Sequence, residues 1–492
     1  MNNKVIQPGD ETSSKRPSAA ALSFTNGAPG RSLLLYGSML LAAVVLFLAI
    51  DAWGKNLAAP EAGAAAGQAT AGLGGKPDAL VHVLIALTAV VIAGQLLGWL
   101  FRYIGQPPVM GEVVAGILLG PSLLGEVWPE AAAFILPPSL APSLGVVSQL
   151  GVILYMFLVG MELNLSALLR QARSVVAISH TSIIVPFVLG SALALILYPG
   201  LAGRGVAFTP FALFVGVALS ITAFPVLARI LTDRQMHRTP LGILALGCAA
   251  VGDVTAWCLL AFVVGVAQAK LGDALVTLGL SAAYIAFLFL VVRPLALRFL
   301  PRFEKTPLSR SLAALVFAAL LLSALATEAI GIHALFGAFL LGAVIPHDST
   351  LAQTFISKLE DLVTVLLLPA FFAFTGMRTR IGLVSGTEQW LICGLIVVVA
   401  TAGKVGATLL SARLTGLGWR NAAALGLLMN TRGLMELIVL NIGLDLNVIS
   451  PPLFAMMVLM AVATTMATAP LLQLLHLKHD EPLCRYPSSS PP

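Results

Sequence analysis

The sequence contains few charged residues and few cysteines, and both shortages limit what the protein can be. Only 10% of its 492 residues are charged, whereas 58% are hydrophobic and the mean hydropathy is +0.96. A soluble domain carries about a quarter charged residues, so the composition predicts a polytopic membrane protein. The four cysteines, Cys248, Cys258, Cys393 and Cys484, lack CxxC or zinc-ligand spacing. We therefore interpret them as packing thiols and expect neither a disulfide nor a bound metal.

Motifs of other protein classes are also missing. The sequence contains no HExxH, no GxSxG and no pair of histidines at ligand spacing, so it offers no cluster for intramembrane catalysis. The polar ends, about 31 and about 18 residues long, lack GxGxxG and GxxxxGK[ST]. We therefore expect no enzyme, no cofactor, no nucleotide-binding regulatory domain and no sensor output domain. The net charge of +6 is better explained by membrane topology than by a nucleic-acid partner.

What the sequence has in abundance is long apolar runs, which predict fourteen membrane spans. The first is Ser32–Ile50, and the others are approximately 79–101, 110–126, 144–163, 174–197, 210–231, 239–268, 273–292, 311–327, 332–346, 362–377, 388–411, 420–444 and 450–474. This layout predicts a cytosolic disordered head (1–31), an extra N-terminal helix (32–52), an Ala/Gly-rich external linker (53–78), a transmembrane domain (79–474) and a short cytosolic tail (475–492). The first run is interpreted as an uncleaved anchor, with a cleaved signal peptide as the alternative.

The distribution of lysine and arginine supports this layout. Placing the N-terminus in the cytosol puts 20 of the 28 basic residues on the cytosolic side, as the positive-inside rule requires. The exceptions are Lys55, Lys76, Arg204, Lys270, Arg378 and Arg380 outside, and Lys404 and Arg432 within the membrane. Both termini are therefore predicted to be cytosolic, in the cell (inner or plasma) membrane.

A weak internal repeat accompanies the spans. Leu118–Gly120 has a counterpart in Leu340–Gly342, and Gly160–Met161 has one in Gly376–Met377. The matched spans lie seven apart, an odd number, so the second copy is inverted relative to the first. The sequence thus predicts an all-α protein with inverted repeats at about 79–268 and 311–474, an architecture common in transporters.

Asp253 is the most informative residue, because it lies in the middle of the apolar segment 239–268. At 1.5 Å per helical residue its carboxylate is roughly 20 Å from the cytosolic end, near the bilayer midplane. An ionisable group at that depth costs on the order of 3 kcal/mol and usually marks an ion or proton pathway. Lys404, Arg432 and Glu436 are predicted to lie at similar depth.

Two spans carry interruptions at matching positions of the repeat. In 216–231, Pro225 removes a backbone hydrogen bond, and Ser220 and Thr222 are predicted to line a break. In 426–443, the segment Asn430–Gly433, which includes Thr431, interrupts an apolar run. Paired breaks indicate a midplane site where freed carbonyls coordinate a cation. The alternative for each span alone is a kinked or polar packing helix.

The other midplane charges have candidate partners. A buried ammonium needs a partner or loses its proton, so Lys404 is predicted to be the charge partner of Asp253, with a structural pair or snorkelling as the alternative. Arg432 and Glu436 stand at i, i+4 and are predicted to form a structural ion pair, with a direct transport role as the alternative.

Taken together, seven motifs resemble the second monovalent cation:proton antiporter family, which includes bacterial sodium/proton and Kef-type potassium/proton antiporters and plant cation/proton exchangers. They are GEVVAGILLGPSLLG (111–125), FLVGMEL (157–163), SITAFPVLARIL (220–231), AAVGDVTAW (249–257), PAFFAFTGM (369–377), AGKVGATLL (402–410) and MNTRGLMELIVLNIG (429–443). They occur in family order and span most of 79–474. The second half looks especially similar to the plant branch.

The resemblance implies a sodium/proton antiporter-like fold with thirteen core helices, two crossed discontinuous helices and a homodimer. It places the ion-binding aspartate at Asp253, the basic core residue at Lys404 and the unwound segments at Thr222–Pro225 and Asn430–Gly433. At Gly252 the sequence departs from the family, which commonly has Asp, Asn or Gln there. That departure puts the exchange stoichiometry inferred from relatives in doubt.

These observations predict a secondary active transporter that exchanges Na⁺ or K⁺ for protons. Asp253 is expected to bind a proton and a cation in turn, assisted by Thr222, Asn430 and Thr431. Burial disfavours the charged carboxylate and Lys404 favours it. No bound metal is expected beyond the transported ion. The alternative is an ion-coupled organic solute carrier on the same fold, since a fold does not fix a substrate.

Overall fold

A computed structural model describes residues 29–57, 78–162, 172–234, 236, 239–267, 271–299, 309–331 and 333–475. Most of the predicted head, tail and external linker lies outside these residues, and the last residues of the head, from Pro29, belong to α1. The first half contains α1 (Pro29–Gly54), α2 (Asp78–Tyr103), α3 (Pro108–Leu119), α4 (Leu124–Val127), α5 (Pro129–Ile135), α6 (Ala141–Glu162), α8 (Ala172–Leu201), α9 (Phe208–Ser220), α10 (Phe224–Asp233) and α11 (Pro240–Ala267). The second contains α12 (Leu271–Phe287), α13 (Arg293–Phe299), α14 (Arg310–Ile330), α15 (Ala334–Val344), α16 (Thr350–Asp361), α17 (Leu368–Arg378), α18 (Gly386–Leu414), α19 (Trp419–Met429), α20 (Leu434–Asp445) and α21 (Pro451–Leu474).

The described part of the chain is all-helical, as the composition predicts, and it is a membrane protein. Eleven of its helices are long and apolar enough to cross a bilayer, and the shorter helices Phe208–Ser220 and Ala334–Val344 are equally apolar. Many large apolar side chains are exposed on the outside of the protein; on α1, for example, Leu41 is 66% exposed and Leu48 is 59% exposed. Such surfaces are unfavourable in water and suit contact with lipid.

Two segments of π-helix interrupt long helices, and each precedes a proline. Leu288–Val292 joins α12 to α13, whose second residue is Pro294, and Leu362–Leu367 joins α16 to α17, whose second residue is Pro369. A proline has no N–H to donate and crowds the preceding turn, so the helix widens there instead of ending.

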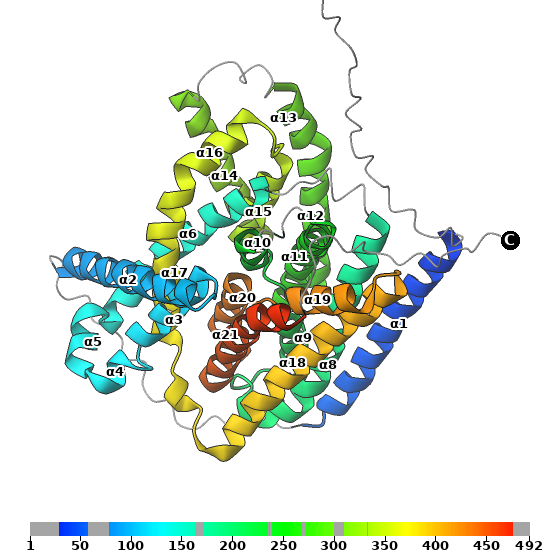
Figure 1. Cartoon of the computed structure of the whole chain (residues 1–492), viewed down its shortest axis with the longest axis horizontal. Helices are drawn as coiled ribbons and strands as arrows, with labels where there is room; N and C mark the ends of the chain where they lie inside the picture. The colour runs from blue at the N-terminus through cyan, green and yellow to red at the C-terminus, as the bar shows by residue number, and fades with distance from the viewer. Residues whose placement is uncertain are drawn as a thin grey trace, which may run out of the picture.

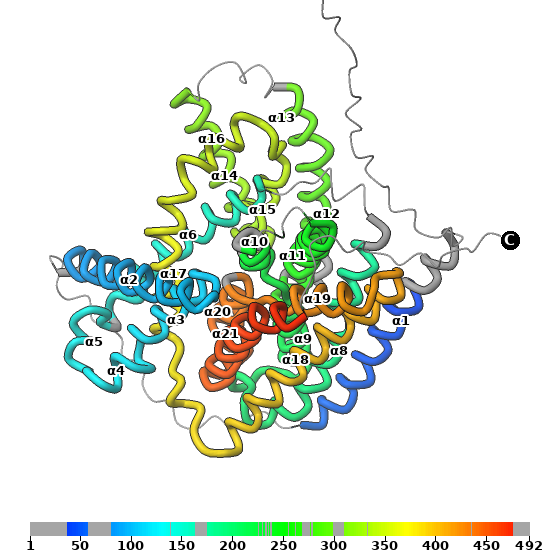
Figure 2. The backbone as a smooth tube through the Cα atoms, viewed as in Figure 1, coloured from blue at the N-terminus to red at the C-terminus, as the bar shows by residue number. Residues whose placement is uncertain are grey.

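The helices form two bundles (Figure 1). One, which we call the scaffold bundle, contains α2, α3, α6, α14, α15 and α17, packed against one another. The other, the core bundle, contains α8, α9, α11, α18, α19, α20 and α21. The α12 segment contacts α11 of the core bundle and α14 of the scaffold bundle, so it links the two. In Figure 2 the tube passes from one bundle to the other at this green segment.

Within the scaffold bundle, the glycines of the sequence repeat pack against one another across the two halves. A Cβ on Gly160 of α6 would collide with the backbone carbonyl of Phe339 on α15, and one on Gly342 with that of Phe157. The α3–α17 contact is equally close at Gly376. Contacts α6–α15 and α3–α17 are equivalent under an exchange of the two halves, which supports the inverted repeat.

The extra N-terminal helix packs on the outside of the core bundle, against α8 and α9. Phe47 contacts Phe187 with ring centroids 5.9 Å apart. At the other end of the helix, the hydroxyl of Thr209 donates a hydrogen bond to the buried carboxylate of Asp51, which also pairs with Lys55 at 2.7 Å. Because Asp51 lies at the N-terminus of α9, it complements the positive end of that helix.

Candidate functional site

The first predicted interruption is a break between α9 and α10. Helix α9 ends at Ser220, the backbone is extended at Ile221, and α10 begins at Phe224 with Pro225 as its second residue. The break lies against the second interruption. The hydroxyl of Thr222 donates to the carbonyl of Met429 at 2.8 Å, and the amide of Ala223 donates to the carbonyl of Thr431 at 2.9 Å.

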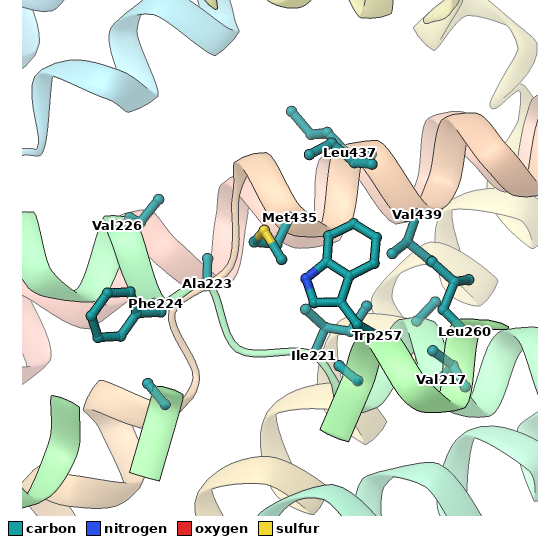
Figure 3. Packing of buried hydrophobic residues seen from close by; sticks show 14 of the residues in the cluster. Val217, Ile221, Ala223, Phe224, Val226, Trp257, Leu260, Met435, Leu437 and Val439 are labelled. Carbon is teal, nitrogen blue, oxygen red and sulfur yellow. The ribbon is translucent and has the colours of Figure 1, made fainter. Parts of the chain in front are cut away.

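The second interruption separates α19 from α20 at Asn430–Gly433. Gly433 has φ +157°, a conformation that favours glycine, and a Cβ there would approach Val226 to 2.9 Å. Thr465 of α21 holds this break, because its hydroxyl accepts from the amide of Arg432 and donates to the carbonyl of the same residue, both at 2.7 Å. The two discontinuous helices therefore cross at their breaks, as the resemblance implies. Figure 3 shows the crossing, with Ala223 of the first break drawn close to Met435 of α20.

Two buried cations cap the C-terminal end of α9. The last carbonyls of a helix have no partner within it and carry its negative dipole end. Arg432 donates to the carbonyls of Ala218 at 3.0 Å and Leu219 at 2.7 Å, and the ammonium of Lys404 donates to the carbonyl of Ser220. Both cationic side chains are fully buried. The break in α9 thus supplies the acceptors that these buried cations require.

Arg432 also pairs with Glu436 of α20 at 2.9 Å, and both side chains have no exposed area. This is the i, i+4 geometry expected from the sequence. It leaves Arg432 engaged on three sides, by Glu436 and by the carbonyls of Ala218 and Leu219. The pair joins the start of α20 to the end of α9.

Asp253 lies in the middle of α11 with 1% of its surface exposed. Neither carboxylate oxygen has a hydrogen-bond partner at ordinary distance among the described residues. Its favourable electrostatic neighbours are the ammonium of Lys404 and the backbone amide of Phe224, the first residue of α10. The expected partner Lys404 is thus nearby, but it is bonded to Ser220 and forms no ion pair with Asp253 within 4.0 Å. The position of Asp253 at a freed helix N-terminus suits a negative charge.

The remaining candidates lie on the same two breaks. Asn430 is buried and its side-chain oxygen has no partner in the described part of the chain. Thr222 and Thr431 donate their hydroxyl protons to the carbonyls of Met429 and Leu428, which leaves lone pairs on both hydroxyl oxygens. Among the residues predicted to bind the ion, the oxygens of Asp253 and Asn430 are therefore the unengaged acceptors; Oε1 of Glu436 in the neighbouring ion pair also has no hydrogen-bond partner in the described part of the chain.

The departure at Gly252 leaves space beside the aspartate. A Cβ on Gly252 would meet only the hydroxyl of Ser179, at 3.7 Å, an ordinary contact. That hydroxyl donates to the carbonyl of Cys248 at 2.9 Å, so it is already used within the core bundle. Sequence analysis did not single out Ser179 or Thr465, because isolated hydroxyls in apolar helices carry no spacing signal.

Comparison with known proteins identifies relatives over most of the chain. The sequence model of a family described as "Sodium/hydrogen exchanger, transmembrane" matches residues 84–474. The chain is 44% identical over 399 residues to the Na(+)/H(+) antiporter NhaS4 of Synechocystis, covering 80% of this chain and 97% of that protein. It is 40% identical over 404 residues to the Cation/H(+) antiporter 20 of Arabidopsis thaliana (79% of this chain, 48% of that one).

Proteins that match at lower sequence identity are also named as antiporters. The chain is 32% identical over 411 residues to the K(+)/H(+) antiporter 1 of Saccharomyces cerevisiae, covering 81% of this chain and 46% of the yeast protein. It thus spans about half the length of the plant and yeast relatives. The solved structure of the sodium proton antiporter MjNhaP1 from Methanocaldococcus jannaschii matches with a TM-score of 0.62 at 15% identity, covering 82% of this chain and all of that one. Helix α1 precedes the matched family region.

Proposed function

The chain belongs to the sodium/hydrogen exchanger family, and we propose that it exchanges a monovalent cation, Na⁺ or K⁺, for protons, with Asp253 as the carboxylate that binds both. The membership rests on the match over 84–474 and on relatives named as antiporters. A transporter, and not an enzyme, is the function that these relatives support.

One observation carries the role of Asp253. Among the described residues, the buried charges Arg432, Glu436 and Lys404 are each bonded to a partner, whereas neither oxygen of the buried Asp253 carboxylate accepts a hydrogen bond at ordinary distance. A buried carboxylate without a partner is costly, since the charged form has lost its hydration. Binding of either a proton or an alkali cation relieves that cost. The carboxylate therefore favours being occupied, and the two occupants exclude each other.

Coupling follows from this competition. In this proposal the oxygen of Asn430 and the hydroxyl oxygens of Thr222 and Thr431, which belong to the crossed breaks, also bind the cation. Oxygen atoms are the ligands that replace the hydration shell of an alkali cation. When a proton occupies Asp253, the negative charge that attracts the cation is gone. Exchange then needs no separate coupling device.

Alternating access is assigned to movement of the core bundle against the scaffold bundle. Arg432 and Lys404 tie the breaks to α9 inside the core bundle, so Asp253 and its neighbours move together. We place the protein in the cell (inner or plasma) membrane with both termini cytosolic, from the distribution of basic residues. From the family resemblance we also propose that two copies of the protein form a homodimer through their scaffold bundles.

The proposal is tested in proteoliposomes with an entrapped pH-sensitive dye. Adding Na⁺, K⁺ or Li⁺ outside should change the internal pH, and Asp253→Asn should abolish that change for every cation. Asn430→Ala should weaken apparent cation affinity while leaving exchange detectable. Full exchange by Asp253→Asn would remove Asp253 from the mechanism. No relative named above is an organic solute carrier, so the comparisons do not favour that alternative.

A further inference from the structure

A polar cluster joins α17 to α20 near the end of each helix. The guanidinium of Arg378, the last residue of α17, donates to the side-chain oxygen of Asn441 at 3.1 Å and forms an ion pair with Asp445, the last residue of α20. The side chain of Arg378 is 28% exposed and that of Asp445 is 52% exposed. This half of the cluster therefore lies at the edge of the protein.

The other half of the cluster is buried. The side-chain amide of Asn441 donates to the hydroxyl of Thr375 on α17 at 3.0 Å, and both residues are at most 6% exposed. Arg378 is also held from its own helix, because its guanidinium lies over the ring of Phe374, 4.7 Å from the centroid. The arginine is thus positioned by α17 and presented to α20.

These contacts cross the boundary between the two bundles. Helix α17 packs against α2, α3 and α6 of the scaffold bundle, whereas α20 packs against α9 and α21 of the core bundle (Figure 1). Helix α20 is also the half-helix that begins directly after the break at Asn430–Gly433. A movement of the core bundle past the scaffold bundle therefore separates these side chains.

We propose that Arg378 and Thr375 of α17 and Asn441 and Asp445 of α20 form a latch, which closes the external side in this conformation and must open once in every transport cycle. The assignment of the external side rests on the proposed orientation, and the need to open rests on the proposed function. The bundles have to change their relative position for alternating access, and hydrogen bonds of about 3 Å cannot survive such a shift.

The latch sets how readily the external side opens. An ion pair with both side chains partly exposed shifts the equilibrium between the closed and the open external side by up to about 1 kcal/mol, which corresponds to a factor of about five in the equilibrium constant. Removing Arg378 is therefore expected to raise the open population about two- to fivefold while leaving the ion-binding residues intact.

Cross-linking tests whether the contact must open. In a background with all four cysteines replaced by alanine, Thr375→Cys/Asn441→Cys is treated with a short bis-methanethiosulfonate and assayed for cation-driven pH change in proteoliposomes. We expect cross-linked protein to lose exchange and dithiothreitol to restore it, which also shows that the variant is folded. Full exchange in the cross-linked state would overturn the latch. If the unmodified protein, with its own side chains and no cross-linker, lacked exchange, the proposed function would fail instead.

Accessibility tests the latch independently of exchange. Thr375→Cys in the same background is labelled from outside with a membrane-impermeant thiol reagent, with and without Arg378→Gln. Labelling should rise about two- to fivefold with Arg378→Gln, and the charge swap Arg378→Asp/Asp445→Arg should return it toward the original rate. Arg413→Gln, which removes an arginine stacked on Trp419 within the core bundle, is the control and should leave labelling unchanged. Equal labelling with and without Arg378→Gln would contradict the proposal.

Discussion

Replacing Glu436 by glutamine tests how the crossed breaks are held together. Glutamine keeps the size of the side chain and one oxygen that accepts from Arg432, but it removes the negative charge. Arg432 has no exposed area and lies 2.9 Å from Glu436, so the change leaves its charge buried without a counter-charge. Breaking a buried pair in this way costs about 3–5 kcal/mol. The carbonyls of Ala218 and Leu219 still accept from Arg432 and reduce the loss, so we expect about 3 kcal/mol.

The assay is unfolding of the purified protein in mixed detergent micelles. Arg432→Gln should be more destabilising than Glu436→Gln, because it also leaves the two carbonyls unpaired, by about 1–3 kcal/mol each. The double variant should be less destabilised than the sum of the single changes. Asp445→Asn, which breaks a partly exposed pair, is the matched control and should cost at most about 1 kcal/mol. The reasoning is refuted if Glu436→Gln and Asp445→Asn have equal effects.

Two further predictions concern packing and charge. Gly160→Ala should destabilise the protein by about 1–3 kcal/mol, because the added Cβ meets the carbonyl of Phe339. Gly406→Ala is the control and should not destabilise the protein, because the space around Gly406 is open. Equal melting curves for the two variants would contradict this prediction. Under the proposed mechanism, Asp253 trades one proton for one cation, so exchange should be insensitive to membrane potential. An exchange rate that follows a valinomycin-imposed potential would contradict this prediction.

Much of the fold follows from the order of apolar runs along the sequence. The runs predict an all-helical membrane protein, and Pro225 together with the segment Asn430–Gly433 predicts where two helices are interrupted. The second break lies at Asn430–Gly433, as predicted. The first lies at 221–223, so Phe224 and Pro225 belong to α10 and not to the unwound segment, because a proline fits the first turn of a helix. The number of crossing helices is a different matter. Among the described residues eleven helical stretches meet the length and hydropathy criteria, α16 and α17 only because they are continuous through π-helix, while α9 and α15 are too short.

The contacts within the site could not be predicted in the same way. The sequence predicts Lys404 as the charge partner of Asp253, because charge alone guides that choice. In the structure the ammonium of Lys404 instead donates to the carbonyl of Ser220. That carbonyl becomes available only when α9 ends, and it lies near Lys404 only when α9 and α18 are packed together. Thr465 bridges Arg432 for the same reason, since α21 reaches the break only in the folded bundle. Sequence patterns predict a break; three-dimensional packing decides which side chain caps it.

Proton release on cation binding is the most direct test that Asp253 serves both ions. Purified protein in weakly buffered detergent solution, at a pH where the carboxyl group is protonated, is mixed with NaCl or KCl, and a pH indicator reports released protons. We expect about one proton per bound cation in the unmodified protein and none with Asp253→Asn, since cation and proton compete for one carboxylate. Choline chloride, whose cation is too large for the site, serves as the control for ionic strength. Proton release of the same size with Asp253→Asn would contradict the account.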